Sequence, residues 1–180
     1  MIYVFLAEGF EEVEALATVD FLRRAGLEVM TVGVTNETVR GSHSIPVVCD
    51  THISRIEPDA ALEAVVLPGG MPGTLNLEAD EKVNEFIDYA YSNGKYVCAI
   101  CAAPSILGKK GLLKGREAIC FPGFEEYLCG ATVSDKSVCA DGKIITAKAC
   151  GVALKFGKVI AEQFVGKEKA DKLWESLYND

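Results

Sequence analysis

Strand-like and helix-like patterns alternate along this chain from one end to the other. Apolar runs of strand length lie at residues 2–7, 27–33, 63–67, 96–100 and 117–120. Helix-like segments lie at residues 11–25, 80–92, 102–110, 151–165 and 168–178, and residues 38–49 and 138–147 fit hairpins. This alternation predicts a mainly parallel sheet with helices on both faces. With no linker or repeat in the pattern, we expect one α/β domain over residues 1–180.

Composition and charge limit the kinds of molecule that this protein is expected to bind. The chain has 180 residues, of which 49% are hydrophobic and 24% charged, as is usual for a globular protein. Its net charge of −8 argues against a nucleic-acid partner, because phosphate binding favours a basic surface. No apolar stretch is long enough to span a membrane, and no basic, cleavable leader follows Met1. We therefore expect a cytoplasmic protein without a membrane partner.

The cysteines point to a reducing compartment. There are seven of them, an odd number at irregular spacing, which does not suit a disulfide framework. We expect free thiols, and the default role of each is that of a small buried hydrophobic residue.

Cys101 stands out because it follows a strand of a parallel sheet, where ligands bind. The segment YVCAICAAP, residues 96–104, predicts a strand that ends at Ile100 and a helix with Pro104 in its first turn. A cysteine at such a sharp turn resembles a nucleophile elbow, and the helix N-terminus is expected to favour the thiolate. From the pattern alone, a core cysteine remains an equal alternative.

The spacing of Cys98 and Cys101 also allows a redox-active pair. We disfavour this interpretation because Cys98 lies inside a strand, where successive side chains alternate between faces. On that pattern the two thiols would point to opposite sides.

Two further strand ends carry candidate groups. Gly69 and Gly70 follow the apolar run 63–67, and consecutive glycine N–H groups can bind an oxyanion, although a simple turn is the alternative. Glu14 lies on the apolar ridge of the helix 11–25, where a buried carboxyl tends to stay protonated. Such a group can donate to a Cys101 thiolate, although periodicity alone favours a boundary residue. Glu12 lies on a polar ridge and is expected to be solvated.

These segments together resemble one known family. AEGFEEVEA (7–15), VVLPGGMPGTLNL (65–77), AICAAP (99–104) and the stretch 144–170 are similar to the ThiJ/PfpI superfamily, in its branch named for a parkinsonism-associated protein. The resemblance implies a three-layer flavodoxin-like sandwich, of the class I glutamine amidotransferase-like kind, and a homodimer. It also implies the roles of the site residues: Cys101 as reactive cysteine, Glu14 as buried glutamate, and Gly69, Gly70 and the Ala102 N–H as oxyanion donors.

The sequence differs from the family at positions that are expected to lie around the substrate pocket. The proteolytic branch has a histidine after the cysteine, where this chain has Ala102, and no histidine follows position 52. Phe121 stands where many relatives have a histidine, and His43 lies near the position of the family's interface arginine. The family's Gly-Pro-Gly loop appears here with Cys150 at its centre, which is expected to lie near Cys101.

The resemblance implies a glyoxalase or deglycase that acts without cofactor or metal on methylglyoxal-like carbonyls, or on glycated thiols or amines. An alternative is a stress-protective redox sensor whose cysteine oxidises without significant turnover. A cysteine peptidase or amidase is disfavoured, because it would need His43 or His52 to reach Cys101 across a dimer interface. The sequence leaves catalysis and sensing open, since both require the same activated thiol.

Overall fold

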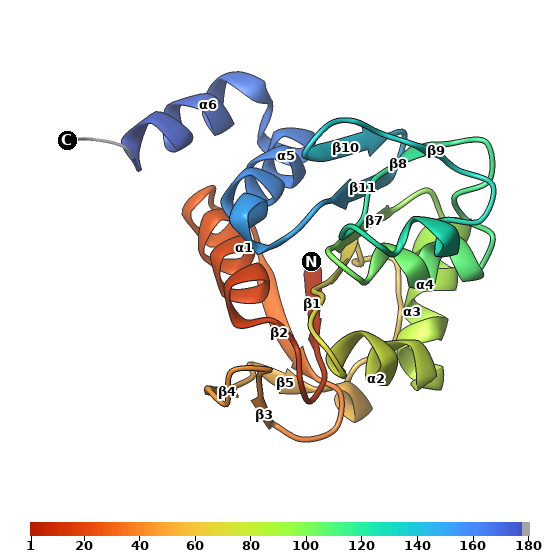
Figure 1. Cartoon of the computed structure of the whole chain (residues 1–180). Helices are drawn as coiled ribbons and strands as arrows, with labels where there is room; N and C mark the ends of the chain where they lie inside the picture. The colour runs from red at the N-terminus through yellow and green to blue at the C-terminus, as the bar shows by residue number, and fades with distance from the viewer. Residues whose placement is uncertain (178–180) are drawn as a thin grey trace.

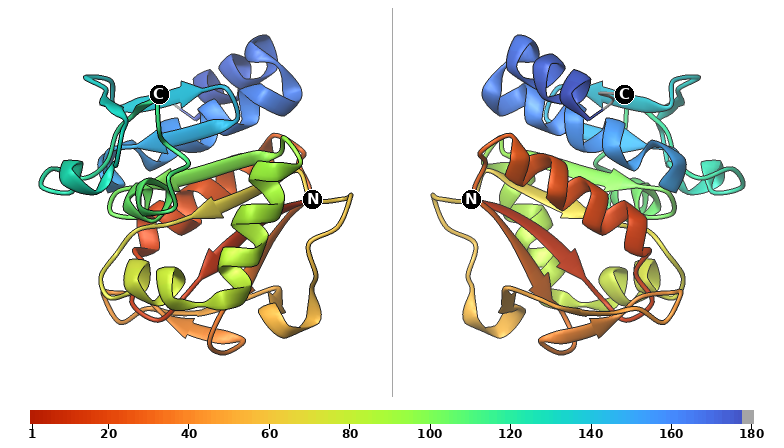
Figure 2. Two further views of the ribbon diagram at one scale, coloured as in Figure 1. Left: turned by 90° about the vertical axis from the view of Figure 1, so that its right-hand side faces the viewer. Right: turned by 90° about the vertical axis from the view of Figure 1, so that its left-hand side faces the viewer.

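A seven-stranded sheet forms the middle layer of the protein. In the computed structural model, which describes residues 1–177, the strand order is β10-β11-β7-β6-β1-β2-β5. All neighbouring strands are parallel except β10 and β11, which form a hairpin. Helices cover both faces (Figures 1 and 2). The predicted three-layer α/β sandwich with a mainly parallel sheet is therefore confirmed.

The elements have the following bounds. The strands of the main sheet are β1 (Ile2–Leu6), β2 (Val29–Gly33), β5 (Thr51–His52), β6 (Ala64–Leu67), β7 (Tyr96–Ile100), β10 (Val138–Asp141) and β11 (Ile144–Ala147). Two small sheets contain β3 (Thr38–Arg40) with β4 (Pro46–Val48), and β8 (Glu117–Ala118) with β9 (Thr132–Val133). The α-helices are α1 (Glu12–Arg24), α2 (Gly73–Ala79), α3 (Glu81–Ser92), α4 (Pro104–Lys109), α5 (Ala153–Val165) and α6 (Lys167–Ser176). Short 3₁₀ turns are η1 (Ile53–Arg55), η2 (Glu125–Tyr127) and η3 (Cys150–Val152).

Alternation along the central strands sorts side chains into two cores. Val4 and Leu6 of β1 face the helices α1 and α5, where Phe21 and Phe156 are fully buried. Residue Phe5 points the other way and packs on α3 through the ring of Phe86, with ring centroids 5.2 Å apart. Burial of aromatic and aliphatic side chains on both faces is what holds the layers together.

The strands that follow β1 and β6 along the chain lie on opposite sides of this strand pair. From β1 it runs through α1 to β2 on one side, whereas from β6 it runs through α3 to β7 on the other. The loops after adjacent strands therefore diverge at this point, which is where open α/β sheets bind ligands.

Most elements match the sequence-based prediction, but some do not. The strands β5 and β9 and the helix α2 were not predicted, and only Glu117–Ala118 of the expected strand 117–120 is extended, in a small sheet apart from the main one. The last position of the expected helix 168–178 lies outside the described residues. No helix within residues 1–177 has both the length and the apolar character needed to cross a bilayer.

Candidate active site

Cys101 forms a sharp turn between β7 and α4. Its φ of 66° is in the left-handed region, which costs an ordinary residue about 1–2 kcal/mol. Two hydrogen bonds hold the turn: the Cys101 N–H donates to Ala147 O over 2.9 Å, and the Phe121 N–H donates to Cys101 O over 2.7 Å. The expected strand-to-helix elbow is therefore present, and Phe121 adjoins the cysteine through its backbone.

Gly69 fills the gap between Cys101 and the helix α1. A Cβ atom on Gly69 would lie 2.7 Å from Cys101 Cβ and 2.7 Å from Glu14 Oε2, closer than carbon and oxygen atoms pack. Only glycine allows the loop after β6 to approach both residues this closely.

Glu14 is buried at this junction, with 1% of its surface exposed. Its Oε2 accepts a hydrogen bond of 2.8 Å from the Gly69 N–H, whereas its Oε1 is buried without a hydrogen-bond partner among the described residues. The helix α1 that carries it is capped by Glu11, whose Oε2 accepts the Glu14 N–H over 2.7 Å. An Oε1 that carries a proton can donate to the sulfur of Cys101, with which the Glu14 carboxyl interacts.

The protons of this pair are coupled. Burial raises the pKa of Glu14 to about 7, although the nearby Cys101 thiol and the Gly69 N–H favour the charged carboxylate and oppose the shift. Burial also raises the pKa of the Cys101 thiol, and a charged Glu14 raises it further, while the N–H groups of Ala102 and Gly70 lower it. The pair therefore loses one proton far more readily than two, and a Cys101 thiolate requires a protonated Glu14.

One expectation about this chemistry is refined and another is corrected. The helix N-terminus was expected to favour the thiolate, and the Ala102 N–H does act to lower the pKa of the thiol, but burial and Glu14 outweigh it, so the pKa is raised. Gly69 was expected to bind an oxyanion, but its N–H donates to Glu14. The N–H groups of Gly70 and Ala102 are the ones that face the sulfur.

His43 and Cys150 do not join this cluster. The imidazole of His43 contacts Glu12, with 2.9 Å between His43 Nδ1 and Glu12 Oε2. Cys150 is exposed and lines a surface pocket with Val13 and Ala17 of α1, which neither Cys101 nor Glu14 lines. The expected proximity of Cys150 to Cys101 stays a prediction.

Glu12 is a structural residue that the sequence pattern missed. It was expected to be solvated, but only 4% of its surface is exposed, because the loop 41–45 covers it. Its Oε1 accepts the N–H of His43 over 2.8 Å, and a Cβ on Gly41 would lie 2.3 Å from the carboxyl carbon. Burial acts to raise the pKa of Glu12. The hydrogen bonds that its carboxylate accepts from the loop 41–45 outweigh this effect and hold the pKa below its usual value. No local signal predicts this burial, since the loop is some thirty residues away along the chain.

Glu11, Glu12 and His43 also form the one metal-compatible cluster found within residues 1–177. One ligand atom from each lies within 4.8 Å of the others. Both oxygens of Glu12 already accept hydrogen bonds from the loop 41–45. The carboxylate of Glu12 therefore acts as a clamp, in the sense that it holds this loop against α1.

Cys98 differs from Cys101 in its surroundings but not in its face of the sheet. Both are free thiols, and Cys98 is fully buried in the α1–α5 core against which Cys101 also packs. The expectation of opposite faces is wrong, because the left-handed turn at Cys101 interrupts the alternation of β7.

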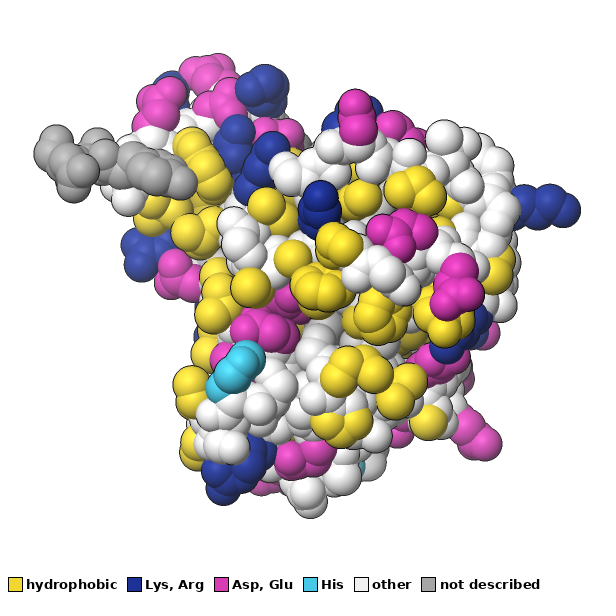
Figure 3. All heavy atoms as spheres, viewed as in Figure 1, with side chains coloured by type: hydrophobic (Ala, Val, Ile, Leu, Met, Phe, Trp, Pro, Cys, Tyr) yellow, Lys and Arg dark blue, Asp and Glu magenta, His cyan; other side chains and the backbone are white. Residues whose placement is uncertain are grey.

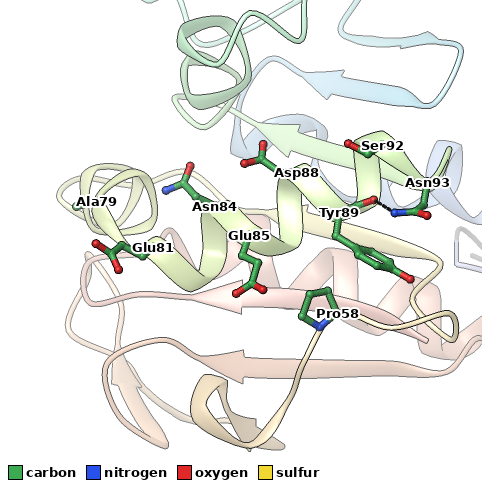
Figure 4. A pocket seen from close by; sticks show the side chains of 9 residues that line it. All are labelled: Pro58, Ala79, Glu81, Asn84, Glu85, Asp88, Tyr89, Ser92 and Asn93. Atoms are coloured by element: carbon green, nitrogen blue, oxygen red, sulfur yellow. Dashed lines mark hydrogen bonds between the residues drawn. The ribbon is translucent and has the colours of Figure 1, made fainter.

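A broad hollow of about 650 Å³ lies away from these residues, along α3. Figure 4 shows that most of its side chains come from this one helix, with Glu81, Glu85 and Asp88 among them. Neither Cys101 nor Glu14 lines this hollow.

Known proteins share the sequence and the fold of this chain. The sequence profile of the DJ-1/PfpI family matches residues 1–163. The chain belongs to the DJ-1/PfpI family. Its resemblance to that family, inferred above from four motifs, is thereby confirmed.

Individual relatives agree over nearly the full length. The protein dj-1beta of Drosophila melanogaster is 35% identical over 177 residues, which are 97% of this chain and 94% of the relative. A protein of Pyrococcus abyssi named a deglycase is 31% identical over 153 residues, or 83% of this chain and 90% of the relative. Among solved structures, oxidised DJ-1 of Toxoplasma gondii has a TM-score of 0.93 at 32% identity and covers 98% of this chain and 96% of its own.

Proposed function

We propose that this protein converts 2-oxoaldehydes such as methylglyoxal to 2-hydroxy acids, with Cys101 as nucleophile and no cofactor. The observation that carries the proposal is the buried Glu14 carboxyl, whose pKa of about 7 lets it take and return a proton beside the thiol at neutral pH. One relative named a deglycase fits the same carbonyl chemistry.

The first step forms a hemithioacetal. The Cys101 thiol gives its proton to Glu14, and the sulfur attacks the aldehyde carbon while the carbonyl electron pair moves to oxygen. The N–H groups of Gly70 and Ala102, which face the sulfur, stabilise this oxyanion until it takes the proton from Glu14.

The second step moves hydrogen between carbons. The Glu14 carboxylate removes the hydrogen of the former aldehyde carbon as a proton, which leaves an enediolate. Glu14 then delivers the proton to the neighbouring carbon, and the hydroxyl proton moves to the former ketone oxygen. The product is a 2-hydroxyacyl thioester, which water hydrolyses to the acid and the free thiol. One carbon is oxidised and its neighbour reduced, so no external oxidant is needed.

Lactate formation from methylglyoxal tests the proposal. Wild type should produce lactate, and Cys101→Ser and Glu14→Gln should each lose at least about a hundredfold in kcat/KM, the usual contribution of such groups. Cys98→Ala, which removes a fully buried thiol outside the site, is the matched control. Absence of lactate from wild type, or full activity of Cys101→Ser, would overturn the proposal.

A second candidate function is redox sensing. The unpartnered, buried Oε1 of Glu14 favours it, because a protonated carboxyl there can donate to a sulfinate oxygen on Cys101. Mass spectrometry after mild peroxide treatment tests this candidate, with the exposed Cys129 and Cys150 as internal controls. Selective gain of two oxygens at Cys101 supports sensing, whereas equal oxidation of all the cysteines contradicts it.

We also propose a cytoplasmic homodimer, in keeping with reduced thiols. Support comes from large apolar side chains exposed on α1, α5 and the loop before β4, namely Val13, Leu16, Leu154 and Ile45. Light scattering coupled to size exclusion gives the mass directly, and a monomer at micromolar concentration would contradict the dimer.

A further inference from the structure

Glu11, Gly69 and Glu14 close a ring of hydrogen bonds beside Cys101. The Glu11 N–H donates to Gly69 O over 2.9 Å, and the Gly69 N–H donates to Glu14 Oε2 over 2.8 Å. The ring closes where the Glu14 N–H donates to Glu11 Oε2 over 2.7 Å. The backbone of Glu11 thus holds the loop that contacts the Glu14 carboxyl, while its side chain holds the helix that carries this carboxyl. The reaction proposed above assigns no role to Glu11.

The side chain of Glu11 brings a second carboxylate close to Glu14. It is 14% exposed, so water screens its charge only in part. Burial is the first cause of the raised pKa of Glu14, and the like charge of Glu11 raises this pKa further. The pKa of the Cys101 thiol is governed first by burial, then by Glu14 itself and by nearby backbone N–H groups. Glu11 is therefore placed to act on the acid of the pair.

The other charged groups around Glu11 leave this effect in place. His43 Nδ1 lies 3.8 Å from Glu11 Oε1 but only 2.9 Å from Glu12 Oε2, so its main partner is Glu12. The imidazole is 70% exposed, and exposed ion pairs are weak. Figure 3 shows a histidine side chain beside acidic side chains on one face of the molecule, next to a region of hydrophobic side chains. The charge of Glu11 is therefore offset only in part.

We propose that Glu11 is a positioning residue that shifts the shared proton toward Glu14 and the negative charge toward the Cys101 sulfur. The pair loses one proton far more readily than two, so its single charge lies either on the carboxylate or on the thiolate. The charge of Glu11 disfavours the carboxylate, which belongs to the same ring, more than it disfavours the sulfur beyond Gly69. It therefore increases the share of thiolate with a protonated acid.

This form of the pair is the one that attacks the aldehyde in the first step. The inference therefore rests on the proposed function for its part in catalysis. Its effect on the thiol and the acid does not depend on any substrate, so it can be measured without turnover.

Two variants separate the hydrogen-bond ring from the charge. Glu11→Gln keeps an oxygen that can accept the Glu14 N–H and removes the charge, whereas Glu11→Asp keeps the charge and is favourable at a helix N-cap. Glu8→Gln is the matched control, since it removes the same charge from the same connection between β1 and α1. Glu8 is also half-buried, and its Oε1 also accepts a backbone N–H, that of Arg40, over 3.3 Å.

The first experiment measures how fast iodoacetamide alkylates Cys101 at pH 8.5, where the pair has lost its first proton. Only the thiolate reacts, so the rate at the peptide that contains Cys101, read by mass spectrometry against the exposed Cys129, reports its share. Glu11→Gln should react about threefold more slowly than wild type, while Glu11→Asp and Glu8→Gln should keep the wild-type rate. Loss of a charge that acted directly on the thiol would speed the reaction, so an equal or higher rate in Glu11→Gln overturns the proposal.

The second experiment titrates the Glu14 carboxyl by NMR, in protein labelled with ¹³C at the glutamate carboxyl carbons and with Glu14→Gln to identify the signal. Glu11→Gln should lower the midpoint of this titration by about 0.5 pH, because a neighbouring negative charge is gone. An unchanged or raised midpoint overturns the proposal, whatever the stability of the variant. Neither readout requires turnover, so a wild-type protein that makes no lactate would overturn the proposed function alone.

Discussion

The backbone N–H of Gly69 donates to the Glu14 carboxyl over 2.8 Å, and the absent side chain of the same residue leaves the space that Cys101 occupies. One glycine therefore both orients the acid and admits the nucleophile. Because the two roles depend on the same backbone position, a single added methyl group disturbs both.

Gly69→Ala should destabilise the protein by about 1–3 kcal/mol, because the new Cβ lies 2.7 Å from both Cys101 Cβ and Glu14 Oε2. Urea unfolding measures the loss. Gly151→Ala is the control, since a Cβ there meets no atom within 4 Å. Equal midpoints for the two variants would contradict the tight packing described here.

Glu14→Gln should make stability less dependent on pH. Burial raises the pKa of Glu14 from 4.5 to about 7, so between these values the folded state holds a proton that the unfolded state has lost. Its contribution to stability is therefore complete below pH 4.5 and is lost as the pH rises to 7. The loss is roughly 3 kcal/mol. Unfolding free energies at pH 5 and pH 7.5 should differ by less in Glu14→Gln, and parallel curves for both proteins would refute the shift.

His43→Ala should weaken the clamp on the loop 41–45 without affecting the chemistry at Cys101. The hydrogen bond and charge of Glu12 raise the pKa of His43 above 6.5. The stabilising ion pair is therefore complete below pH 6.5 and is lost as the pH rises through the higher folded value. The melting temperature of the variant should fall below wild type by more at pH 6 than at pH 9. A large loss of lactate formation in His43→Ala would instead place the histidine in the reaction.

Phe121→His tests whether a missing histidine limits the rate. Position 121 adjoins the cysteine, because its N–H bonds Cys101 O over 2.7 Å. A general acid–base group contributes about 10²–10⁴-fold in favourable geometry, so we expect at least about a tenfold rise in kcat for lactate formation. The pH profile should also gain a limb near the histidine pKa. Phe121→Asn, polar but not titrating in this range, is the control, and an equal rise in both variants would point to access rather than acid–base catalysis.

Local pattern predicted the layers of the fold, since period and segment length are local properties. It predicted the strand-to-helix turn at Cys101, but it left a core cysteine as an equal alternative there. For Glu14, periodicity alone favoured a boundary residue, so the family resemblance was needed to predict its burial beside Cys101.

What the sequence could not predict depends on contacts between distant segments. Glu12 is buried only because the loop 41–45 folds over it, and the N–H of Gly69 is engaged only because Glu14 reaches it from another helix. The raised pKa of the Cys101 thiol has the same origin, since burial and a neighbouring carboxyl are properties of the assembled site. The prediction that Cys101 points to the face opposite Cys98 was also wrong, because the left-handed conformation of Cys101 interrupts the regular alternation of β7.

Cys101 lies where the central strands β1, β6 and β7 end side by side, and its neighbours come from the loops after β6 and β7 and from the helix α1, which follows β1. Its chemical environment therefore exists only while the middle of the sheet is intact. Cys129 and Cys150, which are exposed, should react with a thiol reagent in the folded protein, whereas the fully buried Cys98 should react only after the strands separate. The order in which the cysteines are modified should therefore report the order in which parts of the protein unfold.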